Sequence, residues 1–428
     1  MKSTGLIIIF LFLLVSSDAQ ESDSVQIKNV AELQAEIDSL KKEIRLMNRN
    51  LQEVKEDLVD NRRKADEFID LLDGDSVDEG GMSEDQRSRR KRVDDLLRAI
   101  RQQPGQLRFN GGLTSSFQGN PRGQRDEITG VGSFDIYAMT SFGKGTLLFI
   151  DLEAIGGNGP DDLYNSFMGL NGDAGSYQDE DGVDRLNVLE GWAEFSVFDE
   201  FITITAGKID LTNYFDNNAI ANDETLQFLS GAFVNNAAFV APSNSPGVRF
   251  QTTVLKRFYF QVGLVSMDNS GASLIDDLYK ASSLRFRLFA DSPWETNFRF
   301  YGYQCPEKNK AQGYGVSIDG TAFEEYKIFG RYGRNREALA RNHGISSSWS
   351  AGFSFIQKLE NKGVNIGLAY GEIFPFDEAL KIESQFEIYA RYQFNKWIYT
   401  SPHFQMVWNA RGTNSNYSLV GLRTHFNF

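Results

Sequence analysis

The chain has 428 residues and a formal net charge of −14, with 34 Phe, 16 Tyr and 39 Gly but only 9 Pro. The charge argues against nucleic acid as a partner, because phosphates require a basic protein face, and the single cysteine excludes an intramolecular disulfide. The mean hydropathy of −0.37, with no run of about 20 apolar residues beyond the N-terminus, excludes a bundle of membrane-spanning helices.

Residues 1–19 have the composition of a secretory signal peptide. Lys2 precedes an apolar run at residues 6–15, and Ser17 and Ala19 are the small residues expected before a cleavage site. An uncleaved membrane anchor is the alternative, but about ten apolar residues are short for a span. We therefore expect export from the cytoplasm and cleavage after Ala19.

Residues 25–72 carry a heptad repeat of apolar residues. The narrow seam predicts a left-handed coiled coil, and a single amphipathic helix packed on a domain is the alternative. About 45 helical residues would form a rod of about 65 Å, which we place in the periplasm of a homo-oligomer, with a trimer favoured. The a positions and then the d positions are Val30, Ile37, Ile44, Leu51, Leu58 and Leu33, Leu40, Met47, Val54.

Residues 73–104 read as a linker with a short basic helix. An acidic, Gly-bearing stretch at 73–86 is followed by the basic run RSRRKR at 87–92 and a helical pattern at 93–103. The basic run is either the solvated start of that helix or a contact for anionic groups of the envelope, such as the cell wall.

From residue 107 to the end, polar and apolar residues alternate with a period of two, as in strands with two different faces. The pattern predicts an all-β fold, an antiparallel transmembrane β-barrel of about sixteen strands at residues 107–428. Short links at 198–201 and 256–257 alternate with long polar links at 156–185 and 210–245, as in outer-membrane barrels. The expected strands are 107–117, 128–140, 144–155, 186–198, 201–209, 246–255, 258–267, 283–290, 295–303, 313–319, 325–333, 347–357, 363–371, 382–394, 397–409 and 417–428.

The two faces of these strands differ in charge. In the last strand, Val420, Leu422, Phe426 and Phe428 share one face, and Arg423 lies on the other. A charge facing lipid at the bilayer midplane costs about 2–4 kcal/mol, so the charged faces must line an aqueous lumen. The inward set is Arg249, Arg285, Arg287, Arg299, Arg331, Arg391 and Arg423 against Asp135, Asp151, Glu153, Glu190, Glu194, Glu383 and Glu387.

The stretch at residues 207–250 is too long for a hairpin turn and too apolar for a free external loop. We expect it to fold into the barrel mouth and constrict the pore, and a cap that only packs on the rim is the alternative. The residues assigned to this constriction loop are Tyr214, Phe215, Asp216, Asn222, Asp223, Phe228 and Phe233.

Several motifs resemble the OprB-type carbohydrate-selective porin family, including its cyanobacterial-type relatives. They are GKID at 207–210, YFD to QF at 214–228, AFVNN at 232–236, SPG at 245–247, EIYARYQFNKWIYTSPHFQMVWN at 387–409 and GLRTHFNF at 421–428. The resemblance implies a sixteen-stranded outer-membrane porin, constricted by inserted loops, that passes saccharides by diffusion. Tethered members of the family often carry a surface-layer-homology domain before a coiled coil, and the sequence contains no such domain.

Side chains that line the lumen of the predicted barrel are candidates for solute contact. Arg and Glu can hydrogen-bond sugar hydroxyls, and aromatic faces can stack on sugar rings. A ladder of salt bridges that only stiffens the wall is the alternative. The candidates are Arg285, Arg287, Arg299, Arg331, Arg391, Arg423, Glu194, Glu387 and Trp192.

Three His and one Cys leave no zinc set, so we expect no metal, no cofactor and no enzymatic activity. Acidic stretches at 158–162 and 179–184 could hold calcium, but a solvated loop is the simpler interpretation. The first hypothesis is a passive porin for small hydrophilic solutes, with saccharides as the main class and outer-membrane lipid as its surroundings. The alternatives are a general or cation-conducting porin and an envelope-tethering structural protein.

Overall fold

The computed structural model describes the barrel and little of the segment before it. The first 19 residues, the predicted coiled-coil register, the acidic linker and the basic run lie outside the described residues, and those assignments stay predictions. Seven described positions between Ala35 and Arg45 are helical. The other described residues are 100, 105–122, 127–143, 145–174, 186–198, 201–254, 257–268, 271, 277–289, 292, 294–306, 311–323, 326–359 and 362–428.

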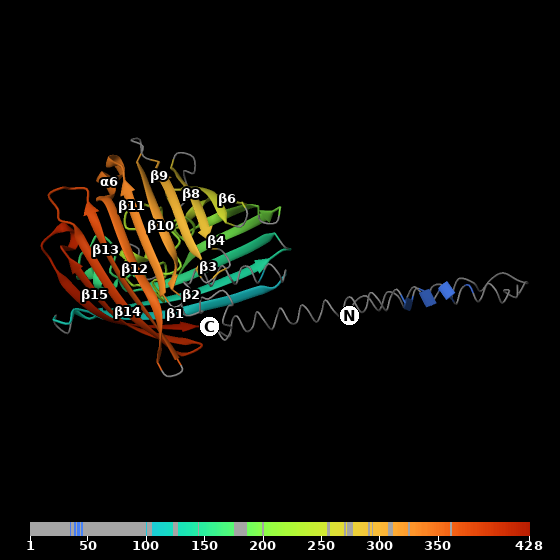
Figure 1. Ribbon diagram of the computed structural model, residues 1–428, viewed down its shortest axis with the longest axis horizontal. Coiled ribbons are helices and arrows are strands. Elements are labelled where there is room, and N and C mark those ends of the chain that lie inside the picture. The colour runs from blue at the N-terminus through green and yellow to red at the C-terminus, as the bar shows by residue number, and fades with distance from the viewer. Residues whose placement is uncertain are drawn as a thin grey trace, which may run out of the picture. The chain divides into compact units, whose positions relative to one another are not determined.

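Sixteen antiparallel strands form a closed barrel, in which each strand pairs with the next and β16 pairs with β1 (Figure 1). The predicted fold class is therefore confirmed. The strands are β1 (Leu107–Gly119), β2 (Thr129–Ser141), β3 (Thr146–Gly156), β4 (Leu186–Val197), β5 (Ile202–Ile209), β6 (Ser245–Val254), β7 (Phe258–Ser266), β8 (Leu278–Leu288), β9 (Thr296–Gln304), β10 (Gln312–Phe323), β11 (Tyr326–Asn335), β12 (Ile345–Leu359), β13 (Lys362–Pro375), β14 (Glu383–Asn395), β15 (Ile398–Trp408) and β16 (Tyr417–Asn427).

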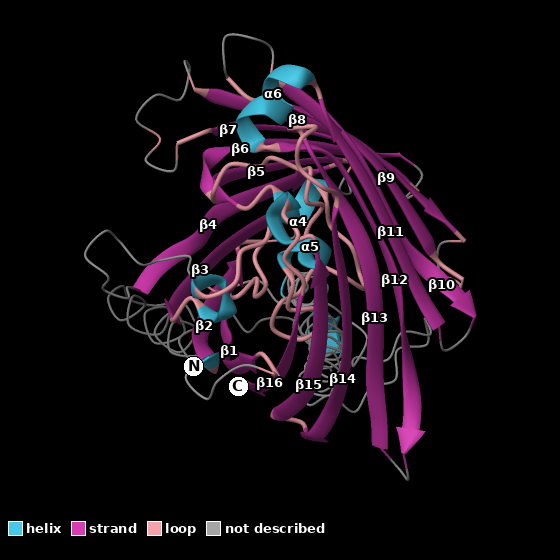
Figure 2. Cartoon of the chain, turned by 90° about the vertical axis from the view of Figure 1, so that its left-hand side faces the viewer, coloured by secondary structure: helices cyan, strands magenta, loops and turns pink. Residues whose placement is uncertain are grey.

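Short helices occur in the connections. Two of them, α4 (Thr212–Phe215) and α5 (Gly231–Val234), lie inside the ring of strands (Figure 2). The others are η3 (Gly159–Asp162), α6 (Glu337–His343) and η4 (Ala410–Gly412). Within the part of the chain that the structure describes, no helix combines the length and the apolar character needed to cross a membrane.

The strands place apolar side chains outside and polar side chains inside. Leu284 and Phe300 are directly opposite on β8 and β9 and are 47% and 48% exposed, whereas the adjacent Arg299 is 4% exposed inside the barrel. Alternation of this kind suits lipid on one face and a polar lumen on the other.

The barrel closes through the last residue. Phe428 and Gly111 exchange two backbone hydrogen bonds of 3.0 and 3.1 Å, and the Phe428 ring stacks on Phe134 at 5.9 Å. A Cβ atom at Gly111 would lie 2.7 Å from the Phe428 ring and 2.5 Å from a backbone oxygen. The missing side chain at Gly111 therefore makes room for the terminal ring.

Strand β8 starts earlier than the sequence pattern indicates. We expected a strand from residue 283, but β8 begins at Leu278. Its early inward positions, Tyr279 and Ala281, are apolar and buried, because chain inside the barrel covers them: Tyr279 donates to the carbonyl of Val240 at 2.8 Å. An inward face that packs on a loop loses the polar alternation by which the other strands are recognised.

Candidate pore and constriction

The connection between β5 and β6, residues 210–244, fills much of the barrel interior (Figure 2). Its apolar side chains contact the wall formed by β11–β14, and Phe228 and Phe233 are fully buried. The Phe228 ring lies 5.8 Å from Phe329 and 5.1 Å from Tyr389. Burial of apolar rings between loop and wall provides the non-directional part of this attachment.

Asp216 is the first polar anchor of the loop. Its carboxylate forms an ion pair with Arg331 of β11 at 3.2 Å and accepts the Tyr301 hydroxyl of β9 at 2.9 Å. Arg331 also donates to the carbonyls of Phe233 and Asp216 at 2.6 and 3.1 Å. One guanidinium thus joins two distant parts of the loop to the wall.

A second set of anchors lies on β14–β16. The Glu387 carboxylate accepts the backbone N–H groups of Leu229 and Ser230 at 2.7 and 2.8 Å. Arg391 donates to the Leu226 carbonyl at 2.8 Å. Arg423 donates to the carbonyls of Glu224 and Gln227 at 2.6 and 2.9 Å. Charge-assisted bonds to backbone groups fix loop position as well as side-chain position.

The connection between β3 and β4 also enters the barrel over its described part, residues 157–174. It pairs with the β5–β6 loop through backbone bonds from Gly172 to Leu229 and from Gly231 to Gly169, at 2.6 and 2.8 Å. Asp161 shapes it by accepting the N–H group of Leu170 at 2.8 Å. Burial raises the pKa of Asp161 to about 6 from its ordinary 3.8, although the hydrogen bonds it accepts lower it.

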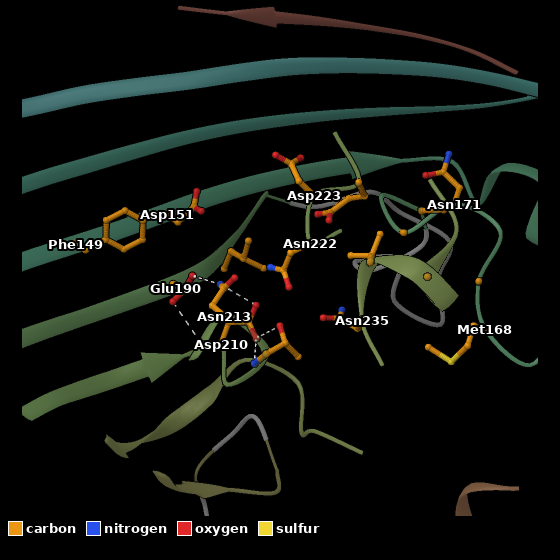
Figure 3. Close-up of a pocket in the computed structure, with 18 residues that line it drawn as sticks. Phe149, Asp151, Met168, Asn171, Glu190, Asp210, Asn213, Asn222, Asp223 and Asn235 are labelled. Atoms are coloured by element: carbon orange, nitrogen blue, oxygen red, sulfur yellow. Dashed lines mark hydrogen bonds between the residues drawn. The ribbon is translucent and has the colours of Figure 1, made fainter. Parts of the chain in front are cut away.

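A cavity of about 360 Å³ remains between these two loops and the β3–β4 wall (Figure 3). Five carboxylates and four amides line it, and the described residues of its lining include no Lys or Arg. Phe149 of β3 adds an aromatic face, which stacks on Trp192 at 5.0 Å. The lining carboxylates and amides are Asp151, Glu190, Asp210, Asp223, Glu224, Asn171, Asn213, Asn222 and Asn235.

Hydrogen bonds orient the acidic side of this cavity. Glu190 accepts the Asn213 amide at 3.2 Å and the Trp192 indole N–H at 3.0 Å. The Asn213 amide also donates to Asp210 at 3.0 Å. The Oδ1 atom of Asn235 is buried and has no hydrogen-bond partner among the described residues.

Like charges face each other on the open wall. The strand register places Asp135 opposite Glu153 and Asp151 opposite Glu190. Carboxylates directly opposite each other on neighbouring strands are unfavourable. These pairs place four carboxylates on the β2–β4 side of the lumen.

The predicted solute-contact residues separate into two groups. Arg331, Arg391, Arg423 and Glu387 bind the β5–β6 loop, as described above. Trp192 supports Glu190 beside the cavity. For all of these, contact with a solute stays a prediction.

The remaining predicted solute contacts lie on β4, β8 and β9. Glu194 pairs with Arg249 at 3.0 Å, and Arg287 pairs with Glu295 at 2.5 Å. Arg285 and Arg299 are direct register partners on β8 and β9. Solute contact by these residues is likewise untested.

The predicted constriction-loop residues occupy different environments. Asn222 and Asp223 line the cavity, whereas Phe215, Asp216, Phe228 and Phe233 are fully buried. The Tyr214 ring lies under the Arg249 guanidinium at 4.1 Å. The amides Asn171, Asn213 and Asn235 were not predicted, because isolated amides in long loops carry no periodic signal.

Comparisons with known proteins agree with this architecture. Residues 308–428 match the family described as "Carbohydrate-selective porin, OprB family". The resemblance to the OprB family is thereby confirmed. The high-pH structure of Pseudomonas putida OprB superposes with a TM-score of 0.65 at 12% identity, covering 75% of this chain and 94% of that chain. Its low-pH structure gives 0.51 at 12% identity, covering 75% and 92%.

A protein of Aquifex aeolicus (strain VF5) named "Uncharacterized protein" is 26% identical over 326 residues, which cover 75% of this chain and 90% of that protein. Together with the closed sixteen-stranded barrel, these findings identify an OprB-like, porin-type outer-membrane barrel. The likeness to the OprB structures shows the fold alone.

Proposed function

We propose that this porin admits small hydrophilic solutes by passive diffusion and that saccharides are its main class. The route runs beside β3–β4, through the cavity between the two inserted loops. The relationship to a family described as carbohydrate-selective supports this proposal.

The observation that carries the proposal is the chemistry of the cavity lining. Carboxylates accept hydrogen bonds from hydroxyl groups, and amides both accept and donate them. Phe149 supplies an apolar face next to these groups. A sugar presents hydroxyl edges and apolar C–H faces, so this mixture suits it better than it suits an apolar ligand. Asn235 contributes a buried acceptor that has no hydrogen-bond partner among the described residues.

The matching experiment uses the full chain in planar bilayers and in liposomes. We expect maltose-type sugars to enter the liposomes and to reduce the ionic current in a saturable way. Asn235→Ala should raise the half-blocking sugar concentration, and Asn342→Ala, on the exposed surface of α6, should not. Current that no sugar reduces, with no sugar entry, would contradict a saccharide route.

A second candidate function is a cation-preferring general porin. It rests on the absence of Lys and Arg among the described residues of the cavity lining, against five carboxylates. Rings of acidic side chains favour cations in pores. The zero-current potential in a salt gradient tests this candidate. Strong cation preference without sugar block would favour it over the saccharide proposal.

The oligomer and the N-terminal rod belong to the same proposal. We propose that residues 25–72 associate as a coiled coil in the periplasm and join protomers into a homo-oligomer, with a trimer favoured. Deleting residues 25–72 tests this assignment, because it should reduce the oligomer measured by light scattering in detergent. An unchanged oligomer would leave the barrel, and not the heptads, as the site of association.

A further inference from the structure

Two arginines face each other inside the barrel, away from the cavity just described. Arg285 of β8 and Arg299 of β9 are direct register partners. Like charges opposite each other on neighbouring strands destabilise a sheet. Their side chains point into the lumen. They lie near the end of the barrel where the short connections are, because β8 runs from the long β7–β8 connection toward Leu288. We call this end of the barrel the short-turn end.

The two guanidinium groups have unequal partners. Arg299 forms an ion pair with Asp319 of β10, which also accepts the Asn297 amide at 3.1 Å. Arg285 lies over the Tyr259 ring, 3.9 Å from its centroid, and none of the ion pairs among the described residues includes it. Among the described residues, Asp319 therefore forms an ion pair with Arg299 and not with Arg285.

Hydrogen-bonding capacity also remains unused at this position. The Nε atoms of Arg285 and Arg299 are both buried without a hydrogen-bond partner. Arg299 is only 4% exposed, so water has little access to it. A buried donor without a partner costs free energy, and an anion placed between the two groups would satisfy both.

Among the described residues of β8–β11 at this end, cations outnumber carboxylates. Lys327 of β11 donates to the Thr321 hydroxyl at 2.7 Å, and Arg287 is neutralised by Glu295. Among the described residues of β8–β11 at this end, the facing charged groups are the cations Arg285, Arg287, Arg299 and Lys327 and the carboxylates Glu295 and Asp319. The opposite sign prevails in the β3–β4 cavity.

We propose that Arg285 and Arg299 form a binding site for the oxyanion group of a small solute, a carboxylate or a phosphate. Guanidinium groups bind both through paired hydrogen bonds, and stacking on an aromatic ring orients the donor in advance. The site extends the proposed function, because it selects a charged group and lies apart from the lining of the saccharide route. The proposed approach is from the short-turn end, because an anion from the other end first meets the acidic cavity.

The test uses the full chain, inserted in one orientation in a planar bilayer with chloride as the background anion. Inorganic phosphate and glucuronate are added to each side in turn, and glucose serves as the neutral comparison. We expect both anions to reduce the current when added at the short-turn end and to act weakly from the other. A response to phosphate alone or to glucuronate alone identifies which oxyanion the site takes.

Arg285→Gln should weaken this block by about tenfold, the size of one charge-assisted hydrogen bond. Arg285→Lys keeps the charge without the planar fork, so we expect an intermediate loss. Lys396→Gln removes an exposed charge from the β14–β15 turn at the same end and should leave the block unchanged. Equal block from both sides, or wild-type block in Arg285→Gln, would overturn the site. Glucose entry measured in the same proteins tests the saccharide proposal separately.

Discussion

The two sides of the barrel interior use similar residues for different purposes. On β9–β16, inward charged side chains such as Arg331, Glu387 and Arg423 hold the β5–β6 loop. On β2–β4, the inward carboxylates Asp151 and Glu190 remain at a cavity. An inward charge therefore does not by itself mark a pore-lining residue, because its role depends on which wall the loop covers.

Packing and charge explain why the loop covers that wall. Phe228 and Phe233 pack against Phe329 and Tyr389 on β11–β14. The backbone carbonyls of the loop accept hydrogen bonds from arginines on the same side of the barrel. The β2–β4 wall presents opposed carboxylates instead, which cannot donate to those carbonyls when they are ionised. The loop and the passage are thus placed by complementary features of opposite walls.

The largest effect is expected from breaking the central anchor on the covered wall. Arg331→Gln leaves the Asp216 carboxylate buried without its cation, which costs about 3–5 kcal/mol. We expect the loop to detach from the β11–β16 wall. Single-channel conductance should then rise, and the loop should become sensitive to protease. The double variant Arg331→Gln with Asp216→Asn replaces the pair by neutral groups and should recover part of the loss. Wild-type conductance in the single variant would show that the apolar contacts suffice.

A packing change on the same wall should act less strongly. A Cβ atom at Gly367 would lie 2.2 Å from the Tyr389 ring, so Gly367→Val should displace that ring from under Phe228. Overpacking of this kind costs about 1–3 kcal/mol, visible as a lower midpoint of heat unfolding in detergent. Gly132→Val on β2, where no heavy atom lies within 4 Å of the added Cβ, is the control. Equal shifts in the two variants would contradict a packed loop on the covered wall.

Removing one carboxylate charge from each wall should change a different measured property for each wall. Glu190→Gln on the open wall should lower the cation-to-anion permeability ratio by about fivefold, as expected for about 1 kcal/mol per charge at 4 Å in water. Because Gln keeps an oxygen that can accept the Asn213 amide, the variant should not release the loop. Glu387→Gln on the covered wall should loosen the loop, measured by protease sensitivity, with little change in the permeability ratio. If Glu190→Gln loosened the loop and Glu387→Gln changed the permeability ratio, the assignment of the open and covered walls would be wrong.

The smallest effect is expected from pH, through Asp161 in the β3–β4 loop. Its pKa in the folded loop is about 6, above the ordinary 3.8, so the folded form binds more protons between these values. Loop stability should therefore be highest below about pH 4, decrease as the pH rises toward 6, and then level off. Protection of this loop from protease, followed over that range, measures the change. In Asp161→Asn, protection of the loop should no longer depend on pH over this range. An unchanged pH dependence in this variant would mean that another group titrates.

Local alternation was sufficient to predict all sixteen strands, because each strand needs one face for lipid and one for a polar interior. The prediction was least accurate at β8, where Tyr279 and Ala281 face chain inside the barrel and not water. Candidate site residues were harder to separate. Nothing in the local pattern distinguishes Arg423, which binds the loop, from Arg285, which is in no ion pair among the described residues.

The sequence by itself determined the barrel, the orientation of its faces and the presence of an unusually apolar connection between β5 and β6. These features depend on neighbours along one strand or within one loop, and periodicity records them. Only the tertiary structure decided which wall that connection covers, and hence where the cavity and the opposed arginines lie. Those positions depend on contacts between residues more than 100 positions apart, such as Asp216 with Arg331, which no local pattern encodes.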